Sequence, residues 1–357
     1  MEKMMSSRFA PAKAGITSAL LLTSLLFSSS LLANSQISVE RKAVGKGVYE
    51  LAYSASQNAL FVASSQGRQE KAGAVYRLDP VSLAVNQSIT TTLKPFGMAL
   101  NNKTNTVFLG NTTSSAVTSI DAKTNQVKKE LVLDSRPRTE KERPLAPREL
   151  VVDEATNTLY VGGLGKESVI WVVDGENLTL RHTLEGVGKM ATGLAIDTKA
   201  SRLYVTNGDG EFITIDTKTN KILSRVKIDN PGEHFYLNLS LDTAKHRAFV
   251  TDSQEANVLV LDTQNGKVLH KIAVPGSLAV LFNPARNEVY VTHRDAGKVS
   301  VIDAESYKVL ETLDMPTHPQ SLAISPDGQT LYVSVKQESS RQKEATSPDD
   351  VVRVTFK

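Results

Sequence analysis

The most regular feature of the chain is a pair of runs in which apolar and polar residues alternate, separated by a short turn. One example is VYVTHRDAGKVSVIDAESYKVL, from Val289 to Leu310. A period of two residues is typical of β-strands with one buried face, so this stretch predicts two antiparallel strands joined by a hairpin. Near copies begin at Arg202 and Ala248, and looser copies begin at Leu60, Val107, Leu159 and Leu331, which makes seven.

An aspartate closes the second run of most copies and marks the period of the repeat. The positions are Asp79, Asp121, Asp174, Asp216, Asp262 and Asp303, at spacings of 41 to 53 residues. Several short strands in units of about 40–50 residues predict a β-propeller. Alternation with a period of two excludes a solenoid of helices. Each aspartate opens a turn such as DAKTN, where we expect its side chain to bond the local backbone rather than a substrate or metal.

Each repeat also contains an apolar strand before the alternating pair, which suits an innermost strand covered on both sides. Aligning these strands places Glu50, Gly97, Glu149, Gly193, Asn238, Ala279 and Ser321 at one position. The seventh repeat ends at Phe356 without a fourth strand, and QISVERKAVG from Gln36 is predicted to supply it and close the ring. The predicted fold is all-β, a seven-bladed propeller of four-stranded blades in one domain, residues 36–357.

The N-terminal segment has the pattern of a cleaved secretory signal peptide, residues 1–35. Three basic residues precede the apolar run from Ile16 to Ala33, and cleavage fits before Gln36 or after Ala33. A membrane anchor is the alternative, but serines and threonines interrupt a run that is shorter than the ~20 apolar residues of a typical span. The chain contains no cysteine, which excludes disulfides, thiol catalysis and cysteine-ligated zinc.

The net charge argues against a positive electrostatic potential over the whole molecular surface. The full chain has a net charge of +3, and removal of residues 1–35 leaves 38 Lys and Arg against 37 Asp and Glu. Any attraction for nucleic acid must therefore come from a local patch.

The predicted strand order places one set of connections at one end of the ring. These connections join fourth strands to first strands and second strands to third strands, and they include two long polar loops, residues 134–149 and 336–350. Bases and aromatic rings gather there, which predicts a binding face, although each residue alone also fits a solvated loop. The candidate residues are Lys46, Tyr49, Lys94, Phe96, Arg148, Lys166, Phe235, Tyr236, His293, Arg294, His318 and Lys336.

One enzymatic hypothesis remains open. Glu50, Glu149 and Asn238 would border the channel and could hold Ca²⁺ or Mg²⁺ through oxygen ligands, as in lactonase-type propellers, with a water activated for hydrolysis. The three residues lie on different blades, so their separation is open. No phosphate-binding loop, zinc-protease or serine-hydrolase motif occurs, and the sequence predicts no cofactor.

The repeats LYVTNGDGEFITIDTKTNKIL and VYVTHRDAGKVSVIDA resemble the YVTN-type propeller repeat. The segments RKAVGKGVYELAYS, RPLAPRELVVDEATNTLY, LAVLFNPARNEVYVTHR and ATSPDDVVRV extend this similarity over the mature chain, to a periplasmic YVTN-repeat β-propeller family of enteric bacteria. The resemblance implies a seven-bladed propeller exported to the periplasm, DNA binding with a preference for single strands, and no catalytic residues. The expected partner is single-stranded DNA, another anionic ligand or a protein, bound by a monomer without a membrane anchor.

Overall fold

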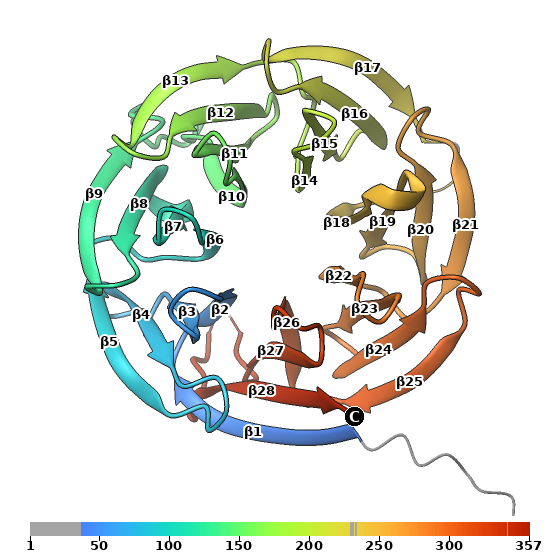
Figure 1. Ribbon diagram of the computed structural model, residues 1–357. Helices are drawn as coiled ribbons and strands as arrows, with labels where there is room; N and C mark the ends of the chain where they lie inside the picture. The colour runs from blue at the N-terminus through green and yellow to red at the C-terminus, as the bar shows by residue number, and fades with distance from the viewer. Residues whose placement is uncertain (1–36, 229–231, 233, 341) are drawn as a thin grey trace, which may run out of the picture. The chain divides into compact units, whose positions relative to one another are not determined.

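The computed structural model describes residues 37–228, 232, 234–340 and 342–357. The predicted signal peptide, residues 1–35, lies outside the described residues. From Ile37 onward the chain forms seven antiparallel sheets of four strands each, arranged in a ring (Figure 1). This confirms the predicted seven-bladed β-propeller. Within the described ranges, no helix is long and apolar enough to cross a membrane.

Each blade runs outward from an innermost strand at the axis to an outermost strand at the rim. Blade one comprises β2 (Val48–Ser54), β3 (Ala59–Ser64), β4 (Gly73–Leu78) and β5 (Val85–Thr91); blade two comprises β6 (Gly97–Asn101), β7 (Thr106–Asn111), β8 (Ala116–Asp121) and β9 (Gln126–Val132). Blade three comprises β10 (Ala146–Asp153), β11 (Thr158–Leu164), β12 (Val169–Asp174) and β13 (Thr179–Leu184); blade four comprises β14 (Gly193–Asp197), β15 (Arg202–Thr206), β16 (Glu211–Asp216) and β17 (Lys221–Lys227).

The second half of the ring repeats this order. Blade five comprises β18 (Tyr236–Asp242), β19 (Arg247–Asp252), β20 (Asn257–Asp262) and β21 (Val268–Ala273); blade six comprises β22 (Val280–Asn283), β23 (Glu288–His293), β24 (Lys298–Asp303) and β25 (Val309–Asp314). Blade seven comprises β26 (His318–Ile324), β27 (Thr330–Lys336), β28 (Asp349–Phe356) and β1 (Ile37–Gly45). Two short 3-10 helices, η1 (Thr112–Ser114) and η2 (Thr243–Lys245), lie in connections.

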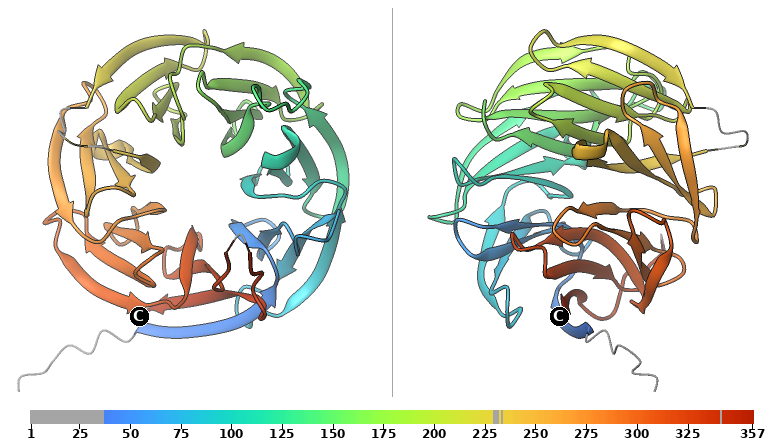
Figure 2. Two further views of the ribbon diagram at one scale, coloured as in Figure 1. Left: turned by 180° about the vertical axis from the view of Figure 1, so that it is seen from behind. Right: turned by 45° about the vertical axis from the view of Figure 1, so that its right-hand side comes forward.

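The N-terminal strand completes the last blade, as predicted. Strand β1 pairs antiparallel with β28, from Ile37 opposite Phe356 to Gly45 opposite Asp349. Figures 1 and 2 show β1 along the rim beside β28 from opposite sides of the ring. The Asp349 carboxylate also accepts a hydrogen bond from the Val48 amide at 2.8 Å, which ties blade seven to the start of blade one. Backbone pairing between the two ends of the chain thus closes the ring without a disulfide.

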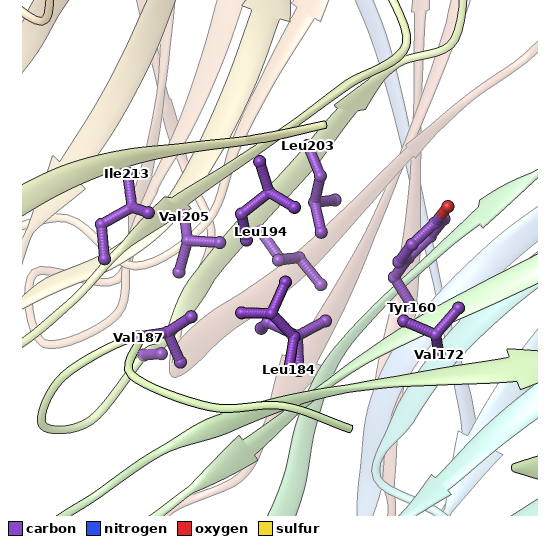
Figure 3. Close-up of a cluster of buried hydrophobic side chains, with 11 residues drawn as sticks. Tyr160, Val172, Leu184, Val187, Leu194, Leu203, Val205 and Ile213 are labelled. Atoms are coloured by element: carbon purple, nitrogen blue, oxygen red, sulfur yellow. The ribbon is translucent and has the colours of Figure 1, made fainter. Parts of the chain in front are cut away.

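Apolar side chains fill the spaces between neighbouring blades. Figure 3 shows the cluster between blades three and four, where Tyr160, Val172 and Leu184 meet Leu194, Leu203, Val205 and Ile213. The middle strands are buried on both faces because each is sandwiched by adjacent blades, whereas the outermost strands are exposed at most positions. Burial at ~25 cal/mol per Å² of apolar surface makes these contacts the main stabilising term.

The repeat aspartates close turns, as predicted. The Oδ1 atom of Asp121 accepts from the amides of Lys123 and Thr124 at 2.8 and 3.0 Å. The other five repeat aspartates likewise accept from the amide two residues further on. The amide and hydroxyl of Ser306 hold the pKa of Asp303 below its usual range. These carboxylates serve the fold.

Candidate functional site

Four of the seven innermost strands carry a β-bulge at their first residues. In each, two residues lie opposite a single residue of the second strand: Tyr49 and Glu50 in β2, Arg148 and Glu149 in β10, Leu237 and Asn238 in β18, and Gln320 and Ser321 in β26. Strands β6, β14 and β22 pair with their neighbours in regular register. A bulge bends the strand and redirects side chains, which is why bulges are frequent beside functional sites. Here they occur on blades one, three, five and seven.

Glycines in two regular strands make room for the bulges that follow. A Cβ atom on Gly97 would lie 2.5 Å from the carbonyl oxygen of Arg148 and 2.9 Å from Cδ1 of Leu150. A Cβ atom on Gly193 would clash with Oγ1 of Thr206 in its own blade and would lie 2.9 Å from Cδ2 of Leu239, just beyond the bulge of blade five. The close approach of bulge and neighbour therefore requires glycine at both positions.

The bulges of blades seven, one and three line a cavity of about 240 Å³ at the axis. Its walls are Tyr49, Glu50, Arg148, Gln320 and Ser321 from the bulges, together with Phe96, Gly97, Thr112 and Leu278. Residues of five blades thus meet in this space, which we call the central cavity.

Glu50 and Arg148 form the polar wall of the central cavity, and Glu149 contacts the same guanidinium without lining the cavity. The Nη1 atom of Arg148 lies 3.7 Å from Oε1 of Glu50 and 3.7 Å from Oε2 of Glu149. Oε2 of Glu50 accepts from the Met98 amide at 2.6 Å, while Oε2 of Glu149 has no hydrogen-bond partner among the described residues. Burial, reinforced by repulsion from Glu149, raises the pKa of Glu50 to about 8, and burial raises the pKa of Glu149 to about 7. The pair therefore retains protons near neutral pH.

Aromatic rings and bases surround the rim of this cavity. The rings of Tyr49 and Phe96 meet edge to face with centroids 4.8 Å apart, and Nζ of Lys336 lies 3.9 Å from the Tyr49 centroid. Tyr49 also borders a second cavity of about 120 Å³, which Lys46, Arg68 and Lys336 line. Tyr49 is thus shared by both cavities.

Arg294 belongs to the same surface. Burial raises the pKa of the Tyr49 hydroxyl, Asp349 adds to this effect, and the nearby charge of Arg294 opposes it. Arg294 lines a cavity of about 470 Å³ with Leu278, which also borders the central cavity. We call Lys46, Tyr49, Arg68, Phe96, Arg148, Arg294 and Lys336 the mouth cluster. Connections of both predicted kinds contribute to it, so the two sets do share one end of the ring.

Two further candidates lie next to the mouth cluster. Nζ of Lys94 donates to the carbonyl oxygen of Gly67 at 2.8 Å, beside Arg68. Nδ1 of His318 lies 3.1 Å from the carbonyl oxygen of Arg294, and its Nε2 lies 3.0 Å from Glu338. Both residues support neighbouring loops.

Two predicted surface residues are buried, so those predictions are wrong. His293 has no exposed surface, its Nε2 lies 2.8 Å from Oγ of Ser300, and burial lowers its pKa. Tyr236 is also fully buried and stacks on His234. Both residues are still paired within a sheet, at the end of β23 and the start of β18, so their side chains point into the blades.

Two other candidates lie apart from the mouth cluster. Phe235 lines a separate cavity of about 470 Å³ with His234 and Lys189. Lys166 is exposed in the connection between β11 and β12 and lines none of the cavities described above. The sequence prediction therefore grouped residues that the structure divides between two places.

Sequence reasoning missed Arg68, Thr112 and Gln320. Arg68 lies between β3 and β4, and its guanidinium donates to the carbonyl oxygen of Ser340 in the second long loop. Arg68 and Gln320 lie in or next to the connections that the sequence analysis placed at this end of the ring, so that analysis could have included both residues as candidates. Nothing in the sequence marks the bulges.

The cation site predicted as an alternative is not assembled as expected. Glu50 and Glu149 do meet, but Arg148 lies between them and supplies the positive charge. Asn238 lies on blade five, where its amide donates to Oγ1 of Thr251 at 3.0 Å. Within the described part of the chain, no group of three or more His, Asp or Glu residues could hold a metal ion.

The fold and this site define a propeller with a polar axial cavity, and comparison with known proteins identifies the family. The model of the YNCE-like beta-propeller family matches residues 38–353, so the chain belongs to that family. It is 62% identical over 339 residues to "Uncharacterized protein YncE" of Salmonella typhimurium (strain LT2), covering 94% of this chain and 96% of the relative. It is 63% identical to the protein of the same name in Escherichia coli (strain K12), with the same coverage.

A solved structure supports the fold alone. Kuenenia stuttgartiensis Hydrazine Synthase aligns with a TM-score of 0.67 at 17% identity, covering 82% of this chain and 93% of that chain.

Proposed function

We propose that this protein is a non-catalytic binding scaffold of the periplasm that holds single-stranded DNA at the mouth cluster. The observation that carries the proposal is the Tyr49 ring, which borders two cavities, contacts Phe96 and lies beneath the ammonium of Lys336. Export follows from the signal peptide pattern at residues 1–35. The proposed scaffold acts as a monomer and needs no cofactor.

The chemistry of single strands suits this surface. Bases stack on aromatic rings at about 1–3 kcal/mol each, while phosphates follow cationic side chains. Lys46 is exposed, and the Arg294 side chain is 46% exposed, so both can reach phosphates. Lys336 serves differently, because it donates to the carbonyl oxygen of Val48 at 3.1 Å and lies 3.5 Å from Asp349. It is held over Tyr49 and fixes that ring.

The small net charge sets the strength of binding. With only a local basic patch, affinity should be weak, and it should fall as salt increases, because release of the condensed counterions then contributes less free energy. An acidic protein would use the same charges, but the aromatic pair favours bases over carboxylates. A hydrolase is less well supported, because Arg148 already provides a positive charge 3.7 Å from each of the two carboxylates that would have to hold a metal ion.

Charge removal at exposed positions tests the proposal. In fluorescence anisotropy with labelled oligothymidine of about 12 nucleotides at about 50 mM salt, Arg294→Ala and Lys46→Ala should each weaken binding several-fold. Each should also lower the slope of log K against log salt by about 1. Lys128→Ala on the rim strand β9 is the matched control, because Lys128 is exposed and distant from the mouth cluster. Equal effects of all three variants, or no binding at low salt, would refute the proposal.

A further inference from the structure

We propose that the central cavity binds one guanine base of the strand, with Glu50 accepting from the two adjacent N–H groups of the base and Arg148 donating to its carbonyl oxygen. This inference rests on the proposed function and adds base selectivity to it. It assigns Glu50 and Arg148 a role that phosphate binding leaves unexplained.

The sign of the charge makes the case for a base rather than a phosphate. At about pH 8.5, where both carboxylates are mostly ionised, Glu50 and Glu149 each lie 3.7 Å from the single guanidinium of Arg148, so this group carries no surplus of positive charge. A phosphate entering the cavity would face Glu50 and would lose hydration without an unopposed cation. The cavity wall therefore suits a neutral group that offers both hydrogen-bond donors and an acceptor. The phosphates would instead contact the exposed lysine and arginine side chains at the rim.

The arrangement of donors and acceptors matches one base best. The Watson–Crick edge of guanine presents a carbonyl oxygen followed by two N–H donors, whereas thymine presents a single donor between two acceptors. A carboxylate has about four acceptor sites, and the Met98 amide uses one of those of Glu50. The 3.7 Å separation of Arg148 from Oε1 of Glu50 exceeds the ~3.2 Å limit of a good hydrogen bond. Both groups thus keep capacity for a ligand.

The size and apolar walls of the cavity suit a single ring system. Its volume of about 240 Å³ is below the ~300–1,000 Å³ of pockets for drug-sized molecules. Phe96 and Tyr49 supply aromatic rings to the lining of the cavity, and such rings can stack on a base. Glu149 lies behind Arg148 as a positioning residue, because it binds the same guanidinium.

Protonation fixes the conditions of the test. Guanine needs an ionised Glu50, and the pKa of that residue is raised to about 8, so binding should be measured at about pH 8.5. The charged groups that shift this pKa are Glu149 and Arg148, both on β10. The strands packed on the other side of β2 carry His318 and Lys336, which are paired with Glu338 and Asp349.

Replacing guanine with hypoxanthine, which lacks only the 2-amino group, gives the sharpest test. The probes are oligothymidines of about eight nucleotides. Four of them carry one central guanine, hypoxanthine, adenine or cytosine, and the fifth carries thymine throughout. The affinity of the protein for each oligonucleotide would be measured at low salt. Guanine should bind about tenfold more tightly than hypoxanthine, which has the same ring system and lacks only the 2-amino group, and more tightly than adenine, cytosine or thymine. Glu50→Gln should reduce the ratio of guanine to hypoxanthine to below about twofold, whereas the exposed control Glu130→Gln should preserve it.

The outcomes separate this inference from the proposed function. Binding of all oligonucleotides with equal affinity would overturn the guanine assignment and leave the scaffold proposal intact. Preference for cytosine, whose edge is the reverse pattern, would also overturn it. No binding of any oligonucleotide would refute both. The comparison of guanine with hypoxanthine uses the unmodified protein, so it stands even if Glu50→Gln folds poorly.

Discussion

Glu50 and Glu149 are acids at the centre of a basic cluster, and their side chains are only about a fifth exposed, 19% and 21%. Arg148 offsets the cost of placing them there. Removing the guanidinium would leave two partly buried carboxylates without a counter-charge, which is a strongly destabilising situation. The three side chains therefore act as a unit.

This unit predicts how stability depends on pH. The pKa values of Glu50 and Glu149 lie above 4.5 in the folded protein, at about 8 and about 7, so the folded state holds protons that the unfolded chain releases. The corresponding stability is complete below about pH 4.5 and is lost as pH rises through 7 and 8. A Glu50→Gln, Glu149→Gln double variant should match the parent at pH 5 and exceed it by on the order of 2 kcal/mol at pH 8.5, allowing for solvent in the cavity.

Urea unfolding at several pH values measures this difference, and Glu130→Gln on β9 is the exposed control. A double variant that is less stable than the parent at pH 8.5 would mean that the carboxylates are ionised favourably, with their pKa values lowered by Arg148.

The burial of single residues could be predicted within a strand, where the alternation of apolar and polar residues shows which side chains face the core. It could not be predicted at the end of a strand. Arg294 is exposed and the residue before it, His293, is buried. The sequence run RD marks a turn, but it does not show that pairing continues through His293 to Lys298. Because the pairing of β23 with β24 extends by one residue to include His293, this histidine belongs to the core and not to the surface.

At the scale of the element, the threonine of the YVT motif joins neighbouring blades. Oγ1 of Thr251 accepts from the Asn238 amide of its own blade and donates to the carbonyl oxygen of Leu278 at 2.8 Å. Oγ1 of Thr292 accepts from the Ala279 amide and donates to the carbonyl oxygen of Gln320 at 3.2 Å. This threonine thus joins the second strand of one blade to the start of the next blade, which explains why this residue type recurs.

The bulges depend on close packing that sequence alone does not reveal. The sequence alignment correctly placed Glu50, Gly97 and Glu149 at one position of the repeat. It could not show that Glu50 and Glu149 lie in bulges, because an added residue at a strand start looks like part of the connection. The register of the regular innermost strands was predictable from the sequence, whereas the bulges in the other innermost strands were not.

Gly97→Ala should disturb both stability and binding. The new Cβ would lie 2.5 Å from the Arg148 carbonyl oxygen, so β6 or the bulge of β10 must move. Overpacking of this kind costs about 1–3 kcal/mol of unfolding free energy, and displacement of Arg148 should weaken oligonucleotide binding. Denaturant unfolding and anisotropy measure the two effects.

Gly276→Ala is the matched control, because its Cβ would meet no atom closer than 3.4 Å. If both variants behave like the parent, the bulge is not constrained by its neighbour.

At the scale of the molecule, stability depends on pairing between the two ends of the described chain. A chain that starts at residue 46 would lose β1 and expose the edge of β28, together with Asp350, whose partner is Arg41 at 2.8 Å. Relative to a chain that starts at residue 36, we expect a loss of several kcal/mol and a tendency to aggregate through the open edge.

A synthetic peptide of residues 36–46 should restore the urea midpoint as its concentration increases, because it binds the folded state alone. An unchanged midpoint without β1 would show that the ring does not need this strand.

The number of blades also has a consequence for the bulges. Bulged blades one, three, five and seven alternate with regular blades two, four and six. Because seven is odd, strict alternation around a circle must fail once, and it fails where blade seven adjoins blade one. There two displaced pairs, Gln320 with Ser321 and Tyr49 with Glu50, stand side by side without a regular strand between them, and all four residues line the central cavity. The parity of the ring breaks its pseudosymmetry and distinguishes one sector, which is the sector where we propose that the ligand binds.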